Sequence, residues 1–145
     1  MVDVNISTID IMVYTKYKKF SVKGWQSLKP YSIAIARGFP VTAMGTKNME
    51  VSLYDSTDKL LELVNNDKYD LTLLSRIDGL VFLNTLNMSD IRRLEPPVAT
   101  VYLYHYLHKK HKLLIPEITA SLLKMKENGR IKAIYDQFIA ELKPE

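Results

Sequence analysis

The sequence contains no cysteine, only one tryptophan and only three histidines among its 145 residues. The absence of cysteine excludes disulfides, thiolate nucleophiles and cysteine-based metal sites. No apolar run approaches the length that a membrane-spanning helix needs. Residues 1–5 lack a basic segment followed by an apolar core, so we expect no secretory signal there. We therefore expect either that the protein is cytoplasmic or that its leader lies outside this sequence.

The residues that are present are typical of a folded domain with a buried core. Hydrophobic residues make up 47% and charged residues 25% of the chain, which is an ordinary balance for a globular protein. The net charge of +4 predicts a weak attraction to anions. Lysine and arginine are scattered, with local clusters at 16–19 and 109–112, so we interpret them as a solvated basic surface and expect no nucleic-acid partner.

Apolar segments and turn signals alternate along the chain up to about Tyr106. Period-two or continuous apolar runs predict strands at 9–14, 31–36, 51–54, 69–74, 91–94 and 98–106, with a turn at 96–97. Helical signals lie between them, at 24–30, at 41–46 after Pro40, after the predicted N-caps Asp55 and Ser56, and at 76–86. This alternation predicts an α/β fold, with three layers around a mostly parallel sheet of about five strands.

The pattern changes after Pro116, where two amphipathic helices are predicted. Apolar residues recur at helical spacing on both sides of Asn128-Gly129, which is a typical helix stop. The chain therefore ends in an all-helical segment.

Five segments occur in a recognisable order. They are Gly24-Trp25-Gln26-Ser27-Leu28, the glycine-terminated strand 31–38, the strand 51–56 with the helix carrying 60–63, the strand 69–74, and 122–131 with its L-x-x-M-K-x-x-G-x-I pattern. Each motif is weak alone, and the specificity lies in their order and spacing. Together they resemble the second half of the bacterial extracellular solute-binding proteins of family 3.

The resemblance implies a lobe of a two-lobed protein that holds its ligand in a cleft between two α/β lobes. Residues 1–106 would form the solute-binding lobe, with the two crossing strands near 9–14 and 103–106. Residues 107–145 would be a C-terminal helical segment that packs on a front lobe largely missing from this chain. The implied partners are a small-molecule solute and a membrane transporter or receptor. The parent protein would be periplasmic or extracellular, without catalysis and without a cofactor.

The bend from Arg37 to Thr42 is the first candidate site, with Arg37, Gly38, Phe39 and Thr42 as predicted ligand-binding residues. A strand that leads through glycine into a helix presents free backbone N–H groups at the carboxyl edge of a parallel sheet, where ligands of open α/β folds bind. Phe39 at the tip could stack on a ring-bearing ligand. Pro40 removes one donor, and the alternative interpretation is a simple tight turn.

Ser75, Arg76 and Tyr104 are the other predicted ligand-binding residues. By resemblance, Ser75 stands where amino-acid binders often carry an aspartate that pairs with the ligand ammonium, a charge that serine cannot supply. Arg76 could instead face an anionic ligand, or be an exposed arginine at a helix start. Tyr104 lies in the segment that resembles the second crossover and could reach the ligand or the hinge. The predicted solute is therefore small and polar or anionic.

Neither a metal site nor a catalytic site is predicted. His105, His108 and His111 recur every three residues, a spacing that spreads the rings too widely for one ion on a straight helix. No histidine is placed near a serine, and no carboxylates are paired for acid–base work. The alternative to solute binding is a structural module that forms a homodimer through its C-terminal helices, because these helices lack their usual apolar partners.

Overall fold

The structure, a computed structural model, describes residues 1–142. The last three residues of the predicted helical segment 107–145 lie outside the described residues. The chain forms two compact units, one of Asp10–Val101 and one of Met1–Ile9 together with the chain from Tyr102 onward. A single boundary near residue 106 is predicted from the sequence, whereas in the structure the nine N-terminal residues group with the C-terminal segment. The reason is that two long strands each run from one unit into the other.

A mixed five-stranded sheet has the order β3-β2-β4-β1-β5. Its strands are β1 (Asn5–Thr15), β2 (Ile33–Ala36), β3 (Val51–Tyr54), β4 (Leu71–Ser75) and β5 (Arg92–Tyr104). Strand β2 pairs in parallel with β3 and with β4, and β1 pairs antiparallel with β4. The predicted α/β class is confirmed, with parallel pairs where helices connect the strands and an antiparallel pair where the long strand β1 joins them.

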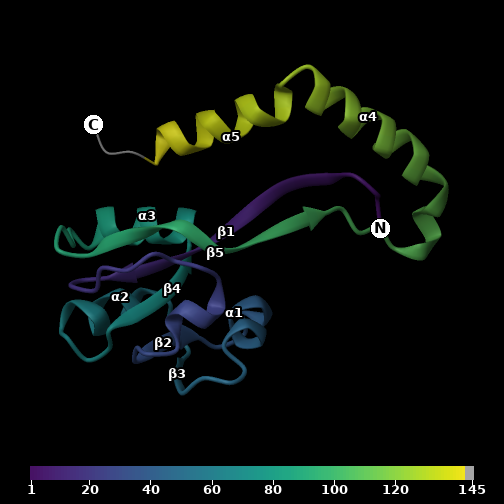
Figure 1. Cartoon of the computed structure of the whole chain (residues 1–145). Coiled ribbons are helices and arrows are strands. Elements are labelled where there is room, and N and C mark those ends of the chain that lie inside the picture. Colours follow the sequence, from purple (N-terminus) through teal and green to yellow (C-terminus); the bar gives the residue numbers. More distant parts are fainter. Residues whose placement is uncertain (143–145) are drawn as a thin grey trace. The chain divides into compact units, whose positions relative to one another are not determined.

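Four short helices connect the strands of the larger unit. They are η1 (Trp25–Leu28), α1 (Pro40–Gly45), α2 (Asp58–Asn65) and α3 (Arg76–Thr85). Figure 1 shows α1 and α2 beside the parallel strands β2, β3 and β4. The predicted N-caps of α2 are wrong, because Thr57 holds the N-cap position and makes no side-chain capping bond. Ser56 instead hydrogen-bonds the Asp58 carboxylate.

Strand β5 is continuous where the sequence predicts two strands and a turn. It runs through Pro96 and Pro97 without interruption. Because β5 lies at the edge of the sheet, a proline that cannot donate to the ladder is tolerated there. The sequence pattern does not reveal which strand is at the edge, so the proline pair indicated a turn.

The core of the larger unit lies between α2 and the sheet. Leu60, Leu61 and Val64 of α2 are fully buried, and they belong to one cluster with Met12 and Tyr14 of β1. The stretch Ile11–Thr15 is buried at every position, which requires cover on both faces of the sheet. These contacts fix the strands whose ends form the candidate site.

The C-terminal segment consists of η2 (Lys109–Leu114), α4 (Ile115–Glu127) and α5 (Arg130–Glu141). The predicted helix stop is confirmed, because Gly129 has a φ of 74° and separates α4 from α5. No residue of α4 or α5 is buried, although both helices carry apolar stripes. Within residues 1–142, no helix combines the length and the apolar character needed to cross a membrane.

The start of α3 is held by a close contact between Gly79 and Tyr14. A Cβ at Gly79 would lie 2.0 Å from the Tyr14 hydroxyl oxygen, so only glycine lets the helix approach this ring. Burial raises the pKa of the Tyr14 hydroxyl to about 12, with smaller opposing effects from Arg93 and Arg76. The hydroxyl lies 3.5 Å from the carbonyl oxygens of Ser75 and Arg76. Tyr14 therefore packs against the turn between β4 and α3 and supports it.

We predict that Gly79→Ala lowers the free energy of unfolding by about 1–3 kcal/mol, because the overpacking outweighs the gain in helix propensity. Urea denaturation would measure the change. The matched comparison is Gly79→Ala in a Tyr14→Ala background, where the added methyl group meets no ring and its cost should shrink. An equal cost in both backgrounds would contradict the contact.

Candidate functional site

The bend between β2 and α1 presents several backbone N–H groups without partners. Arg37 is not among them, because its amide donates to the Tyr54 carbonyl at 2.8 Å. Pro40 has no N–H, and the first amide engaged after it is that of Ala43, which donates to Phe39. Among the described residues, no partner accepts from the amides of the remaining four positions, Gly38, Phe39, Val41 and Thr42. The predicted donors therefore exist, although α1 has six residues and contributes little dipole.

The side chains of the bend are partly committed to its own shape. Gly38 has a φ of 86°, a conformation that favours glycine. The Thr42 hydroxyl donates to the Phe39 carbonyl at 3.0 Å and is buried, so it braces the bend. Phe39 is 45% exposed, which leaves its ring accessible at the tip. The predicted stacking position is thus open, whereas the Thr42 hydroxyl can offer a ligand only its acceptor side.

The turn between β4 and α3 lies next to this bend and carries a carboxylate. Ser75 is the N-cap of α3, and its Oγ accepts from the Asp78 amide at 2.9 Å. The same hydroxyl donates to Asp78 Oδ2 at 2.7 Å. The Ser75 hydroxyl is therefore an N-cap that also holds the Asp78 side chain. It fixes the Asp78 carboxylate at the carboxyl end of the sheet.

A pocket of about 10 Å³ joins the two turns, which is room for about one water-sized group. Its floor is apolar and comes from strands β1, β2 and β4, where Ile11 stands opposite Ser75 in the register. Its polar lining consists of Thr42, Thr57, Ser75 and Asp78. The pocket can thus hold one functional group of a solute, with Phe39 at its side.

Among the described residues, Asp78 is the one ionisable residue that lines this pocket, and it is not one of the site residues predicted from the sequence. A carboxylate here opposes an anion and favours a cationic or hydrogen-donating group. The predicted anionic preference is therefore not supported by the lining. The spacing Ser75-x-x-Asp78 before an apolar helix is the sequence signal that could have found it. Thr57 was also missed, and it has no comparable signal.

Arg76 does not line the pocket, because an ion-pair network holds its guanidinium. Nη1 and Nη2 donate to the two carboxylate oxygens of Glu95 at 2.7 and 3.1 Å. Nε donates to Asp10 at 3.2 Å, and the other Asp10 oxygen accepts from the Thr100 hydroxyl. The hydrogen bonds from Arg76 lower the pKa of Glu95 despite partial burial. These contacts tie the start of α3 to β1 and β5 and leave Arg76 unsuited to bind a ligand anion.

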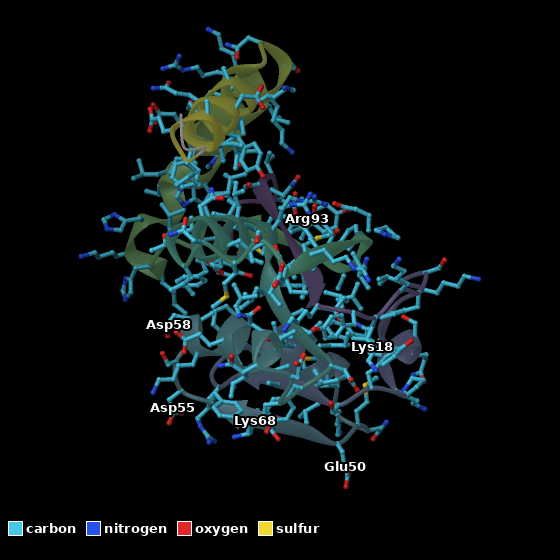
Figure 2. All side chains as sticks on the ribbon, turned by 90° about the vertical axis from the view of Figure 1, so that its left-hand side faces the viewer. Lys18, Glu50, Asp55, Asp58, Lys68 and Arg93 are labelled. Carbon is cyan, nitrogen blue, oxygen red and sulfur yellow. The ribbon has the colours of Figure 1, made fainter. Side chains whose placement is uncertain are left out.

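Arg37 and Tyr104 remain predictions as ligand residues. The Arg37 Nε donates to Asp55 at 2.8 Å in an exposed pair, and Figure 2 marks Asp55 at the surface of the larger unit. Such an exposed pair is weak, so Arg37 could exchange it for a solute. Tyr104 is a half-buried residue near the end of β5, in the unit that contains the C-terminal helices.

The three histidines follow one another along the chain: His105 comes directly after β5, His108 is the N-cap of η2, and His111 lies within η2. The His105 carbonyl accepts from the Val2 amide at 2.9 Å, which ties the two long strands together in the smaller unit. Throughout the part of the chain that the structure describes, no three or more His, Asp or Glu side chains gather in a way that could hold a metal ion.

Comparison with solved structures places this arrangement in a known fold. The ligand-binding core of GluR0 in complex with L-glutamate superposes with a TM-score of 0.71 at 11% identity, over 92% of this chain and 61% of that chain. A histidine kinase sensor domain with similarity to periplasmic binding proteins gives 0.67 at 13% identity, over 92% and 60%. A mutant of ArgBP from T. maritima gives 0.67 at 12% identity, over 94% and 60%.

The fold is periplasmic-binding-protein-like. At these identities the similarity concerns the fold alone, and this chain spans about three-fifths of the length of those structures. No protein-family model matches the sequence. No curated protein matches it either.

We predict that Arg76→Gln lowers the free energy of unfolding at pH 7 by up to about 1 kcal/mol, since Glu95 is half exposed and screened. The pKa of Glu95 is lowered in the folded state, so its stabilising contribution is present above its unfolded pKa. It is lost as the pH falls through the folded pKa. The difference from wild type should therefore narrow at about pH 3.

Urea denaturation at both pH values measures this effect, and Arg37→Gln is the control, because the pair of Arg37 with Asp55 is more exposed than the pair of Arg76 with Glu95. An equal loss for Arg76→Gln at both pH values would show that the pair with Glu95 is not the cause.

Proposed function

We propose that this chain binds a small polar solute at the pocket between the β2–α1 bend and the β4–α3 turn. It would act as one lobe of a solute-binding protein of family 3, serving transport or sensing without catalysis. The observation that carries the proposal is that Phe39 and Thr42, whose amides have no acceptor within residues 1–142, line one pocket together with the Asp78 carboxylate. This pocket lies at the carboxyl ends of two neighbouring parallel strands, where open α/β sheets bind ligands.

The lining favours a solute with two kinds of polar group. The free amides of the bend suit a carboxylate or another acceptor. The Asp78 carboxylate suits an ammonium, guanidinium or hydroxyl group. Two similar structures carry amino acids, L-glutamate in one and arginine in the other. A zwitterionic solute meets both requirements, with Phe39 alongside its side chain.

The small pocket volume implies that a second surface encloses the rest of the solute. We assign this role to the front lobe of the parent protein, which corresponds to the two-fifths of the similar structures that this chain does not cover. Lobe closure on the solute would then bias a membrane transporter or receptor. The parent protein would be periplasmic or extracellular.

We predict that L-arginine binds the chain weakly and saturably, and that Asp78→Asn raises its dissociation constant by about tenfold, because a charged partner is lost. Isothermal titration calorimetry measures both values. L-Glutamate, acetate and glucose complete the panel.

The control is Asp90→Asn, which removes an exposed carboxylate that does not line the pocket. The proposal would be contradicted if the parent protein bound none of the panel compounds, or if the two variants changed the affinity for L-arginine equally.

A homodimer through the C-terminal helices is the second candidate function. It is favoured by the absence of any buried residue in α4 and α5. Leu123 of α4 and Ile134, Tyr135 and Phe138 of α5 are between 38% and 48% exposed, so both helices leave large apolar side chains uncovered. Surfaces of this kind usually mark interfaces. In this role the helices would pair with those of a second copy.

We predict a dimer mass at high protein concentration by analytical ultracentrifugation, with the dimer lost in Phe138→Glu because the charge would be buried at the interface. The control Gln137→Glu places the same charge one position away. A strictly monomeric mass at all concentrations would exclude the dimer.

A further inference from the structure

A groove on the larger unit forms a second candidate binding surface, and it shares no lining residue with the solute pocket. The groove, called here the α1–β5 groove, lies between η1, α1 and the segment Ala99–Val101 of β5. Its volume is about 480 Å³. This is within the range of ligand-binding sites, about 300–1,000 Å³. The groove is therefore large enough for several side chains.

Helix α1 separates the two sites because its residues alternate between two faces. Thr42 lines the solute pocket, whereas Val41, Met44 and Gly45 line the groove. Residues three and four positions apart share a helix face, which explains this division. The Trp25 ring packs against Gly45 so closely that a Cβ there would lie 2.2 Å from it. Trp25 is thus fixed in place as a rigid wall of the groove.

The apolar part of the remaining groove surface is adaptable. Met44 is 77% exposed, and Met49 lines the same groove with Val101. Methionine side chains are flexible and polarizable, so surfaces that contain them accommodate varied apolar side chains. A fixed tryptophan beside flexible methionines suits an aromatic or large aliphatic side chain. The uncharged polar residues of the lining, which can hydrogen-bond a peptide backbone, are Gln26, Asn48 and Thr100.

The charge of the groove has one sign. Lys29 and Lys47 line it, and no acidic residue does. Neither lysine has an ion-pair partner within residues 1–142, in contrast to Lys16 and Lys18, which pair with Asp67 and Asp70. The groove therefore lacks the negative charges that would complement it. A partner that supplies carboxylates would complete it.

We propose that the α1–β5 groove docks a short acidic peptide segment of a partner protein, with one apolar side chain against Trp25 and carboxylates beside Lys29 and Lys47. The groove is open to solvent, whereas small-molecule sites enclose most of their ligand. Two lysines are few for a nucleic-acid footprint, which uses many phosphate contacts. A peptide uses both the apolar floor and the basic rim.

The emission of Trp25 tests this proposal directly, because it is the single tryptophan of the chain and lines the groove. The probe is the acetylated and amidated hexapeptide Asp-Glu-Leu-Phe-Asp-Glu, titrated into the full chain. The expected result is a saturable change in emission that weakens with added salt. The comparison peptide Asn-Gln-Leu-Phe-Asn-Gln should bind several-fold more weakly.

Variants assign the effect to the groove. Lys29→Glu combined with Lys47→Glu should raise the dissociation constant of the acidic peptide by about tenfold, and Met44→Ala should raise it less. Lys59→Glu carries the same kind of charge change on α2, outside the groove, and should bind like wild type. Circular dichroism verifies that each variant is folded.

Three results would overturn the proposal. The first is no saturable response of Trp25 to the acidic peptide. The second is equal affinity for the acidic and the neutral peptide, or an equal loss in Lys59→Glu and in the groove variants. The third is a single-stranded oligonucleotide that binds more tightly and displaces the peptide, which would make the occupant a nucleic acid.

Discussion

The hydrogen bonding of β4 on both of its sides is the constraint on which the candidate site depends. Its parallel pairing with β2 brings the β2–α1 bend and the β4–α3 turn to the same edge of the sheet. Its antiparallel pairing with β1 sets Ile11 opposite Ser75 and Tyr14 opposite Thr72. A slip of one residue would turn every side chain of β4 to the other face. The pocket lining and the support of α3 by Tyr14 would then be lost together.

The two turns divide the chemistry of the pocket between backbone and side chain. The bend contributes amides that have no acceptor within residues 1–142, and the β4–α3 turn contributes a carboxylate that its hydrogen bonds with Ser75 hold in place. The ion pairs of Arg76 act behind this turn, linking the first residues of α3 to β1 and β5. The positive charge of Arg76, which the sequence offered for ligand binding, is thereby used for structure. The negative charge of Asp78 lines the pocket instead.

Much of the larger unit could be predicted from local sequence signals. Apolar runs bounded by glycine and proline placed β2, β3 and β4 and the helices between them, and Asn128-Gly129 marked the break between α4 and α5. Predictions that depend on distant partners differed from the structure. The proline pair of β5 indicated a turn because edge position is not a local property, and Arg76 was assigned to a ligand because Glu95 approaches it only in the folded chain.

The structure brings three of the predicted site residues together, but it adds a charge that the sequence did not indicate. Phe39 and Thr42 of the bend line one pocket with Ser75, and their role as ligand-binding residues stays a prediction. Asp78 was overlooked because the sequence does not pair it with another ionisable residue, whereas in the folded chain its hydrogen bonds with Ser75 hold it at the pocket. Ser75 shows that one residue can cap a helix and also line a pocket, and only the folded geometry reveals the second role.

Two-dimensional NMR of the isotope-labelled chain during the addition of L-arginine would show which backbone amides the solute contacts. Binding at the pocket should give saturable shifts concentrated at Gly38, Phe39, Thr42 and Ser75. Shifts that are absent at these amides, or that spread over the surface without saturation, would contradict it.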